Sequence, residues 1–277
     1  MASQNVVTES WNRAADALES DVMRLVRYKK CIRYFLDLDR QSKIVEVGCG
    51  EGSGLRLLKD LGFRRLFGVE VSIKRLQRAR NKIGGDIPLL LVSPTGGLPL
   101  KTGSVDAVVS AAVIEHTVDP RVFVHEMARI VCPGGYVVIS SDCYSWRILQ
   151  LLGIYRSVQP IDRALFPTTL FRYFRESGLQ VLSCEGFPLP GQEFRFLKLL
   201  AQTLLMLPKS AIQRLIPAAL KLRVRSILPR QRRINALATD AMPTGPSLMW
   251  ETWPQALGIS SFLKLLFSDE NVFFLTK

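Results

Sequence analysis

The sequence predicts an α/β fold, in which strands of a mostly parallel sheet alternate with helices. The first observation is an apolar strand, a glycine-rich turn and a helical pattern in direct succession over residues 44–58. The second is Glu70, an acid at the end of the next apolar strand, residues 66–71. Because open α/β sheets bind ligands at the carboxyl ends of their strands, we expect a ligand site beside the glycine turn and Glu70.

The turn itself has glycine at every second position, at Gly48, Gly50 and Gly52. Glycine adopts backbone angles that a Cβ forbids and lets a ligand lie against the main chain. A dinucleotide fingerprint, Gly-x-Gly-x-x-Gly, does not fit, because its third glycine would fall on Ser53 or Leu55 in the two available registers. The turn is therefore unlike that of a dehydrogenase.

The segments that follow continue the alternation of strands and helices. Ser72 is a plausible N-cap for a helix to about residue 82, and Asp119 with Pro120 begins another helix as N-cap and first-turn proline. The remaining expected elements are a strand at 105–110, a Pro-Gly-Gly turn at 133–135, a strand at 136–140, a helix at 168–178, and strands at 179–184 and 271–276.

Taken together, these segments resemble the class I S-adenosylmethionine (SAM)-dependent methyltransferases, and within them the type 11 small-molecule methyltransferases. Residues 46–52, Glu-Val-Gly-Cys-Gly-Glu-Gly, resemble the family's motif I, Glu/Asp-x-Gly-x-Gly-x-Gly. The resemblance covers about residues 40–186 and the C-terminal strand. It implies a Rossmann-like seven-stranded sheet with helices on both faces, SAM as the cofactor, and methyl transfer to a small-molecule acceptor.

The resemblance also implies which residues contact the cofactor. The acid and glycines of motif I would hold the methionine end of SAM, and Glu70 would accept hydrogen bonds from the ribose diol. Since a strand-end carboxylate supports little of the core, we expect replacement of Glu70 to change thermal stability very little. The expected cofactor contacts are Glu46, Gly48, Cys49, Gly50, Gly52, Glu70, Val71, Ser93 and Ser110.

One position departs from the family pattern. The family usually has an acid after the third strand to hold the adenine amino group, but residues 91–95 are Leu-Val-Ser-Pro-Thr. A hydroxyl of Ser93 or Thr95 could replace the acid as a weaker acceptor. This departure leaves open a protein that binds SAM without transferring its methyl group.

The candidate catalytic residue is His116, just after the fourth strand, as the titratable group that the sequence places at the mouth of the pocket. A histidine there could remove a proton from the acceptor, although a structural histidine that bonds a loop backbone is an equal alternative. With two histidines, and five cysteines without a Cys-x-x-Cys pair, the sequence suggests neither a metal site nor a disulfide framework. We interpret Cys49 as a small turn-filling residue rather than a nucleophile.

The net charge of +13 is concentrated in one region. Residues 194–233 hold ten Lys or Arg side chains and no acid, interleaved with leucines and cut by prolines. Such a segment is typical of a membrane interface, and no apolar run reaches the roughly 20 residues of a membrane span. A lid over the acceptor pocket is the alternative, and nucleic acid is disfavoured because aromatics for base stacking are sparse.

The expected domain organisation has three parts. Residues 1–40 form an N-terminal helical cover, residues 41–189 and 269–277 form the SAM-binding domain, and residues 190–268 form a helical insertion between the last two strands. The N-terminal residues have no signal-peptide pattern, so we expect a cytoplasmic protein, with a peripheral membrane location as a variant of this expectation.

These features lead to the hypothesis of O- or C-methylation of a small lipophilic or membrane-associated acceptor. Methylation of a soluble sugar or polyketide intermediate, SAM binding without transfer, and a membrane-interaction protein that reuses the fold remain alternatives.

Overall fold

The computed structural model describes residues 9, 12, 21–95, 97–142, 161–163, 165–187 and 270–277. The chain divides into two compact units, Met1–Phe196 with Thr252–Lys277, and Leu197–Glu251. The second unit, the predicted insertion at 190–268 and the basic segment 194–233 within it all lie outside the described residues. The predictions of a membrane contact or a lid therefore stay predictions.

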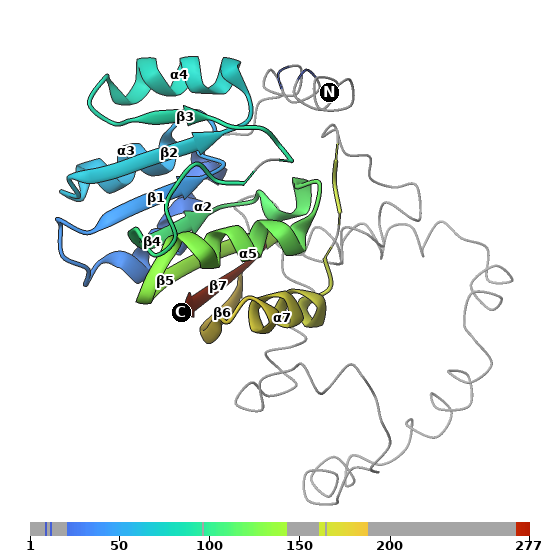
Figure 1. Ribbon diagram of the computed structural model, residues 1–277. Helices are drawn as coiled ribbons and strands as arrows, with labels where there is room; N and C mark the ends of the chain where they lie inside the picture. Colours follow the sequence, from blue (N-terminus) through green and yellow to red (C-terminus); the bar gives the residue numbers. More distant parts are fainter. Residues whose placement is uncertain are drawn as a thin grey trace, which may run out of the picture. The chain divides into compact units, whose positions relative to one another are not determined.

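Seven strands form one mixed sheet in the described part of the chain (Figure 1). Their order is β3-β2-β1-β4-β5-β7-β6, in which β3 to β5 are parallel and β7 runs antiparallel to both of its neighbours. The strands are β1 (Lys43–Val47), β2 (Arg65–Glu70), β3 (Leu89–Leu91), β4 (Val105–Ser110), β5 (Val131–Asp142), β6 (Gln180–Phe187) and β7 (Glu270–Thr276). The expected seven-stranded Rossmann-like sheet is confirmed.

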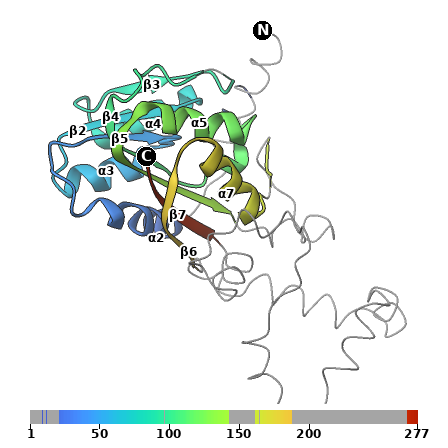
Figure 2. The same cartoon turned by 60° about the horizontal axis from the view of Figure 1, so that its bottom comes forward.

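Helices cover both faces of this sheet, as Figures 1 and 2 show. One apolar cluster packs under α2, α3 and α4, and another packs under α5 and α7. The period-two alternation of β1 explains the separation, because Ile44 belongs to the first cluster and Val45 to the second. The helices are α2 (Asp21–Ile32), α3 (Ser53–Asp60), α4 (Ile73–Ile83), α5 (Pro120–Ile130) and α7 (Pro167–Glu176), with single 3₁₀ turns η1 (Arg33–Phe35) and η2 (Ile114–His116).

The predicted helix caps are present. The Ser72 hydroxyl accepts the backbone N–H of Arg75 at the start of α4. The Asp119 carboxylate accepts two backbone N–H groups at the start of α5, where Pro120 occupies the first turn. Each cap satisfies donors that the helix itself leaves without partners.

The fifth strand differs from its predicted bounds. The Pro-Gly-Gly segment is part of β5, which begins at Val131 rather than at Tyr136. Val131 pairs with Val105, and the next pair along β4 is Ala107 with Tyr136, so the extra residues of β5 form a bulge. Gly134, at a φ of 76°, supplies the left-handed angle that this bulge requires.

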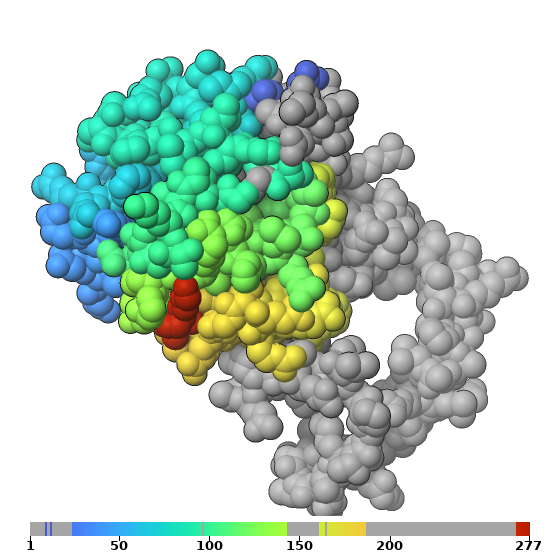
Figure 3. Space-filling view, viewed as in Figure 1, coloured from blue at the N-terminus to red at the C-terminus, as the bar shows by residue number. Residues whose placement is uncertain are grey.

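The C-terminal strand closes the sheet between elements that precede it by more than 80 residues. β7 pairs with β5 on one side and with β6 on the other, and Figure 3 shows its red end at the surface between the green and yellow segments. Its first residues, Glu270 and Asn271, are buried at the carboxyl end of β5. β7 therefore delivers polar groups to the edge of the sheet where the ligand site is expected.

Candidate functional site

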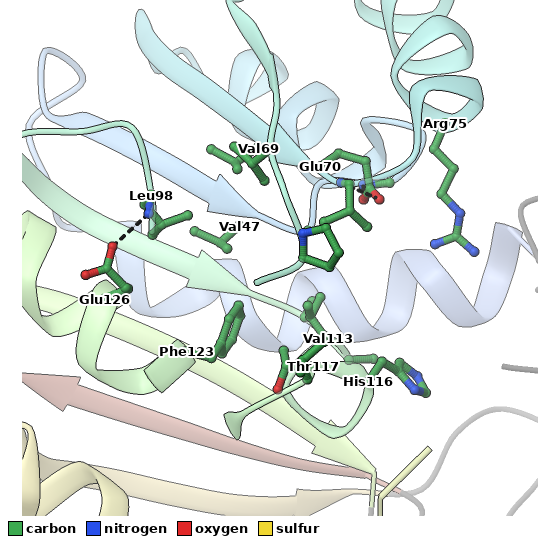
Figure 4. Close-up of a pocket in the computed structure, with 18 of the residues that line it drawn as sticks. Val47, Val69, Glu70, Arg75, Leu98, Val113, His116, Thr117, Phe123 and Glu126 are labelled. Atoms are coloured by element: carbon green, nitrogen blue, oxygen red, sulfur yellow. Dashed lines mark hydrogen bonds between the residues drawn. The ribbon is translucent and has the colours of Figure 1, made fainter. Parts of the chain in front are cut away.

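A cavity of about 450 Å³ lies at the carboxyl ends of the parallel strands. In Figure 4 Glu70 lies on one side of it, and Val113, His116 and Thr117 lie on the other. The strands β1, β2 and β4 all end at its wall, which is the position where open α/β sheets bind ligands.

The glycine turn forms one wall of this cavity. Gly48, Gly50 and Gly52 have φ values of 77°, 52° and 79°, all in the left-handed region that favours glycine. A Cβ at Gly48 would lie 2.4 Å from a methyl carbon of Val113, so the turn packs tightly there. A Cβ at Gly50 would meet nothing within 4 Å, and Gly50 lines the cavity. The open main chain at Gly50 is therefore a cradle that any larger residue would partly fill.

Glu70 joins this turn to the end of β2. Its side chain is buried, with 5% of the residue exposed. Its Oε2 accepts the Gly50 N–H at 2.9 Å, and its Oε1 accepts the N–H groups of Val71 and Ser72 at 3.0 Å each. These three bonds argue against the expectation that Glu70 contributes little to stability, because three backbone donors depend on one carboxylate.

Glu46 lies behind the cavity wall and does not line the cavity. It is fully buried, and a Cβ placed at Gly54 would lie only 2.5 Å from its Oε1, so the carboxyl group sits over α3 near Tyr28. Burial raises the pKa of Glu46 to about 8. The alternation of β1 sends this side chain toward α2 and α3, so the structure does not bring it to the cavity surface.

Of the nine residues expected to contact the cofactor, some line the cavity and others do not. Gly48, Gly50, Glu70, Val71 and Ser93 line the cavity, whereas Glu46, Cys49, Gly52 and Ser110 do not. Cys49 and Ser110 are fully buried, and Gly52 is the N-cap of α3. These four residues therefore belong to the elements that form the wall but are not themselves at its surface.

The part of the wall after β3 carries hydroxyls. Ser93 and Thr95 are exposed, line the cavity and have their hydroxyl oxygens 3.3 Å apart.

The loop that follows, at Leu98, is held by two residues of α5. The Leu98 N–H donates to Glu126 at 2.7 Å, as Figure 4 shows, and Arg129 donates to the Leu98 carbonyl and to both oxygens of Glu126. Hydrogen bonding to Arg129 lowers the pKa of Glu126, so this carboxylate stays charged as a loop clamp.

His116 lies in the cavity wall with its ring held by the backbone. Its Nδ1 is 2.8 Å from the carbonyl oxygen of Ile161, which can only accept, so Nδ1 carries the proton. This is the loop-backbone bond of the structural alternative. It also fixes the tautomer, which leaves Nε2 as the basic nitrogen of the neutral ring.

Several titratable residues at the cavity were missed by the sequence analysis, which treated His116 as the group at the pocket mouth. They are Arg24, Arg27, Tyr28, Arg75, Asp142 and Asp162. Two signals could have found some of them. Arg24, Arg27 and Tyr28 are spaced three and four apart and so share a helix face, and Asp142 ends a parallel strand.

A buried polar cluster lies where β5 and β7 meet this wall. Arg27 Nε donates to both carboxylate oxygens of Glu270, at 2.7 and 2.6 Å, and the Ser140 hydroxyl donates to the same carboxylate at 2.5 Å. Glu115 is fully buried and accepts the Asp142 N–H at 3.2 Å. Nearby, Ala112 lines the cavity at a φ of 52°, an uncommon angle for a residue with a Cβ.

In the described part of the chain, no group of three or more His, Cys, Asp or Glu side chains is arranged to hold a metal ion. In the same residues, no helix has both the length and the apolar character that crossing a membrane requires.

Comparison with known proteins places these features in a family. Residues 45–139 match the family model described as "Methyltransferase domain". The ubiquinone biosynthesis O-methyltransferase of Thiobacillus denitrificans is 30% identical over 158 residues, which are 52% of this chain and 67% of the relative. The 2-methyl-6-phytyl-1,4-hydroquinone methyltransferase of Synechocystis sp. is 34% identical over 99 residues, 35% of this chain and 31% of the relative. The chain spans less than two-thirds of several curated relatives, for example 62% and 37% of two others.

The fold has counterparts among solved structures. A chain of the complex between the Haloferax volcanii Trm112 methyltransferase activator and a methyltransferase superposes with a TM-score of 0.56 at 18% identity, covering 99% of this chain and 96% of that chain. The match extends the likeness of fold beyond the segment matched by the family model. From the motif, the sheet order and these relatives, the chain belongs to the family of class I SAM-dependent methyltransferases.

Proposed function

We propose that this chain binds SAM in the cavity beside Glu70 and transfers its methyl group to a small lipophilic acceptor. The observation that carries the proposal is the joined glycine turn and Glu70 carboxylate at the cavity wall. Family membership supports the cofactor, and the open main chain at Gly50 fits a ligand that lies flat against the turn.

The residues at the cavity suggest how the cofactor would be held. Glu70 would accept hydrogen bonds from the ribose hydroxyls, and the backbone from Gly48 to Gly50 would lie along the methionine end. Ser93 and Thr95 would face the adenine with hydroxyls in place of the family's carboxylate. When bound, SAM supplies an electrophilic methyl group, which forms a bond to the acceptor atom as its bond to sulfur breaks and leaves the electron pair on sulfur, while the acceptor loses a proton.

The chain's own contribution to this reaction is positioning and exclusion of water. Holding two reactants in line converts a bimolecular step into an effectively unimolecular one. This can lower the activation free energy by several kcal/mol, on the order of 7–11 kcal/mol in the best cases. The bonds from Glu126 and Arg129 to the loop at Leu98 and the backbone bond of His116 hold opposite parts of the wall in place.

The apolar lining favours a lipophilic acceptor. Val47, Val69, Leu98, Val113 and Phe123 all contribute to the wall, and apolar pockets with a few polar groups are typical of small-molecule sites. The names of relatives in ubiquinone and phytyl-hydroquinone methylation support a ring with an apolar tail. Methylation of a soluble sugar or polyketide, and SAM binding without transfer, remain the alternatives.

The acceptor class is tested by incubating the protein with isotopically labelled SAM and separate lipid and soluble extracts. We expect label in one or a few lipid-phase compounds, identified by mass spectrometry. Label in a water-soluble product alone would contradict a lipophilic acceptor. Saturable SAM binding with no labelled product in either extract would favour the SAM-binding protein without transferase activity.

The Gly50 cradle predicts a specific effect of a side chain at this position. Gly50→Val should weaken SAM binding tenfold or more in calorimetry, because its Cβ would occupy space open to the cavity. The matched control is Gly134→Val, which also introduces a Cβ at positive φ with nothing within 4 Å, but in the β5 bulge. Both variants carry the same kind of backbone strain. Equal SAM affinities in the two would therefore contradict the proposal that SAM lies against the main chain at Gly50.

The Glu70 network predicts a loss of both affinity and stability. Glu70→Ala should weaken SAM binding by about 1–3 kcal/mol and lower the free energy of unfolding by a similar amount, because three backbone donors lose their acceptor. Asp106→Ala is the control, since Asp106 also accepts a backbone N–H, from Lys43 at 2.7 Å, but does not line the cavity. It should lose stability and keep its SAM affinity. Unchanged affinity in the Glu70 variant would show that the carboxylate is structural only.

We further propose that residues 194–233 bring the acceptor site to anionic membranes. Ten basic residues without an acid among leucines support this, and such attraction is screened within about 8–10 Å at physiological salt. Co-sedimentation with anionic vesicles should be strong at low salt, fall as salt rises, and drop when Arg223, Arg225, Arg232 and Arg233 become Gln. A wild-type protein that ignores anionic vesicles at low salt would instead favour a lid over the pocket.

A further inference from the structure

A pair of carboxyl groups in the cavity wall has no role in the function proposed above. Asp142 ends β5 and lines the cavity, and Glu115, in η2, lies behind it with no exposed surface. The two are joined by the bond from the Asp142 N–H to Glu115 Oε1 at 3.2 Å. The other oxygen of Glu115, Oε2, is buried and has no hydrogen-bond partner among the described residues.

The charges around the pair do not neutralise both of its members. Arg27, on α2, is bonded to both oxygens of Glu270, on β7, which the Ser140 hydroxyl also contacts. The guanidinium therefore compensates Glu270 first. Among the described residues, His116 is a second basic group whose charge acts on Asp142. In the part of the chain that the structure describes, no Lys or Arg side chain bonds the carboxyl group of Glu115 or of Asp142.

Such a pair holds a proton at neutral pH. Burial raises the pKa of Glu115 to about 8. Burial, and then the charges of Glu115 and Glu270, raise the pKa of Asp142, while Arg27 and His116 act in the opposite direction. Because two like charges in one buried site strongly disfavour double ionisation, the pair keeps one proton that a nearby cation would help to displace.

We propose that the Glu115–Asp142 pair gives up this proton when a sulfonium cation enters the cavity, so that the pair becomes the counter-charge of the cofactor's reactive centre. The proposal rests on the proposed function, because it requires SAM in this cavity. The charge balances, since one proton leaves to solvent as one positive charge arrives. Once the methyl group has been transferred, the sulfur is neutral and the pair can take a proton back.

The test compares SAM with S-adenosylhomocysteine, which lacks the methyl group and the positive charge on sulfur. Titration calorimetry at pH 7, repeated in two buffers with different ionisation enthalpies, gives the number of protons released on binding. We expect about one proton released with SAM and none with S-adenosylhomocysteine. By linkage, the ratio of SAM affinity to S-adenosylhomocysteine affinity should increase as the pH is raised toward 8, by up to about tenfold per pH unit. Above pH 8 the ratio should level off, because the pair has already lost its proton.

Two variants test whether the proton comes from this pair. Asp142→Asn and Glu115→Gln remove one carboxyl group each with little change of shape, and each should abolish the difference in proton release between the two ligands. Should one of them fail to fold, the other carries the test. Glu126→Gln is the control, because Glu126 also lines the cavity but its pKa is lowered, so it carries no proton to release.

The outcomes separate the two proposals. Failure of both ligands to bind would overturn the proposed function. Binding of both with equal proton release would overturn the role of the pair and leave the proposed function standing. Release that persists in both pair variants and disappears in His116→Asn would assign the proton to His116 and also overturn this inference.

Discussion

The carboxylate of Glu70 is the interaction on which the architecture of the site depends. It accepts one N–H from the glycine turn and two from the residues that follow β2. Two crossover connections of the sheet therefore meet on one side chain. Such charge-assisted bonds are about twice as strong as neutral ones, and they fix the backbone at Gly50 in a left-handed conformation that faces the cavity. The same group would then serve both the fold and the proposed ribose contact.

The two sides of the cavity are stabilised by different polar interactions. On the side of Glu70, backbone N–H groups and one carboxylate form a rigid polar cradle. On the side where β5 and β7 meet, the guanidinium of Arg27 on α2 bonds the buried carboxylate of Glu270, and no such bond reaches Glu115 or Asp142 among the described residues. α2 is thus part of the site as well as of the core, where Cys31 and Ile32 pack with α3 residues. A helix that the sequence suggests as a cover contributes its charge to the polar cluster.

Local sequence signals were sufficient for most of the strands, the helix caps and the glycine turn, because each depends on a few neighbouring residues, although the predicted start of β5 was wrong. Period-two alternation and the left-handed angles at Gly48 and Gly50 belong to this class. The direction of the Glu46 side chain could also be predicted from the alternation of β1. Glu46 is two residues after Ile44 and therefore points to the same face of the sheet, toward α2 and α3. The Arg27–Glu270 bond joins residues 243 positions apart. No local pattern signals that contact, because β7 must first insert between β5 and β6.

The central claim is that the glycine turn and Glu70 together form the cofactor site of this methyltransferase. Its most direct test is a crystal structure of the wild-type chain grown with SAM. The account predicts the ribose hydroxyls within hydrogen-bond distance of Glu70, with the Gly50 N–H still donating to the same carboxylate and the methionine end along Gly48 to Gly50. SAM bound elsewhere, or a ribose held without any contact to Glu70, would contradict it.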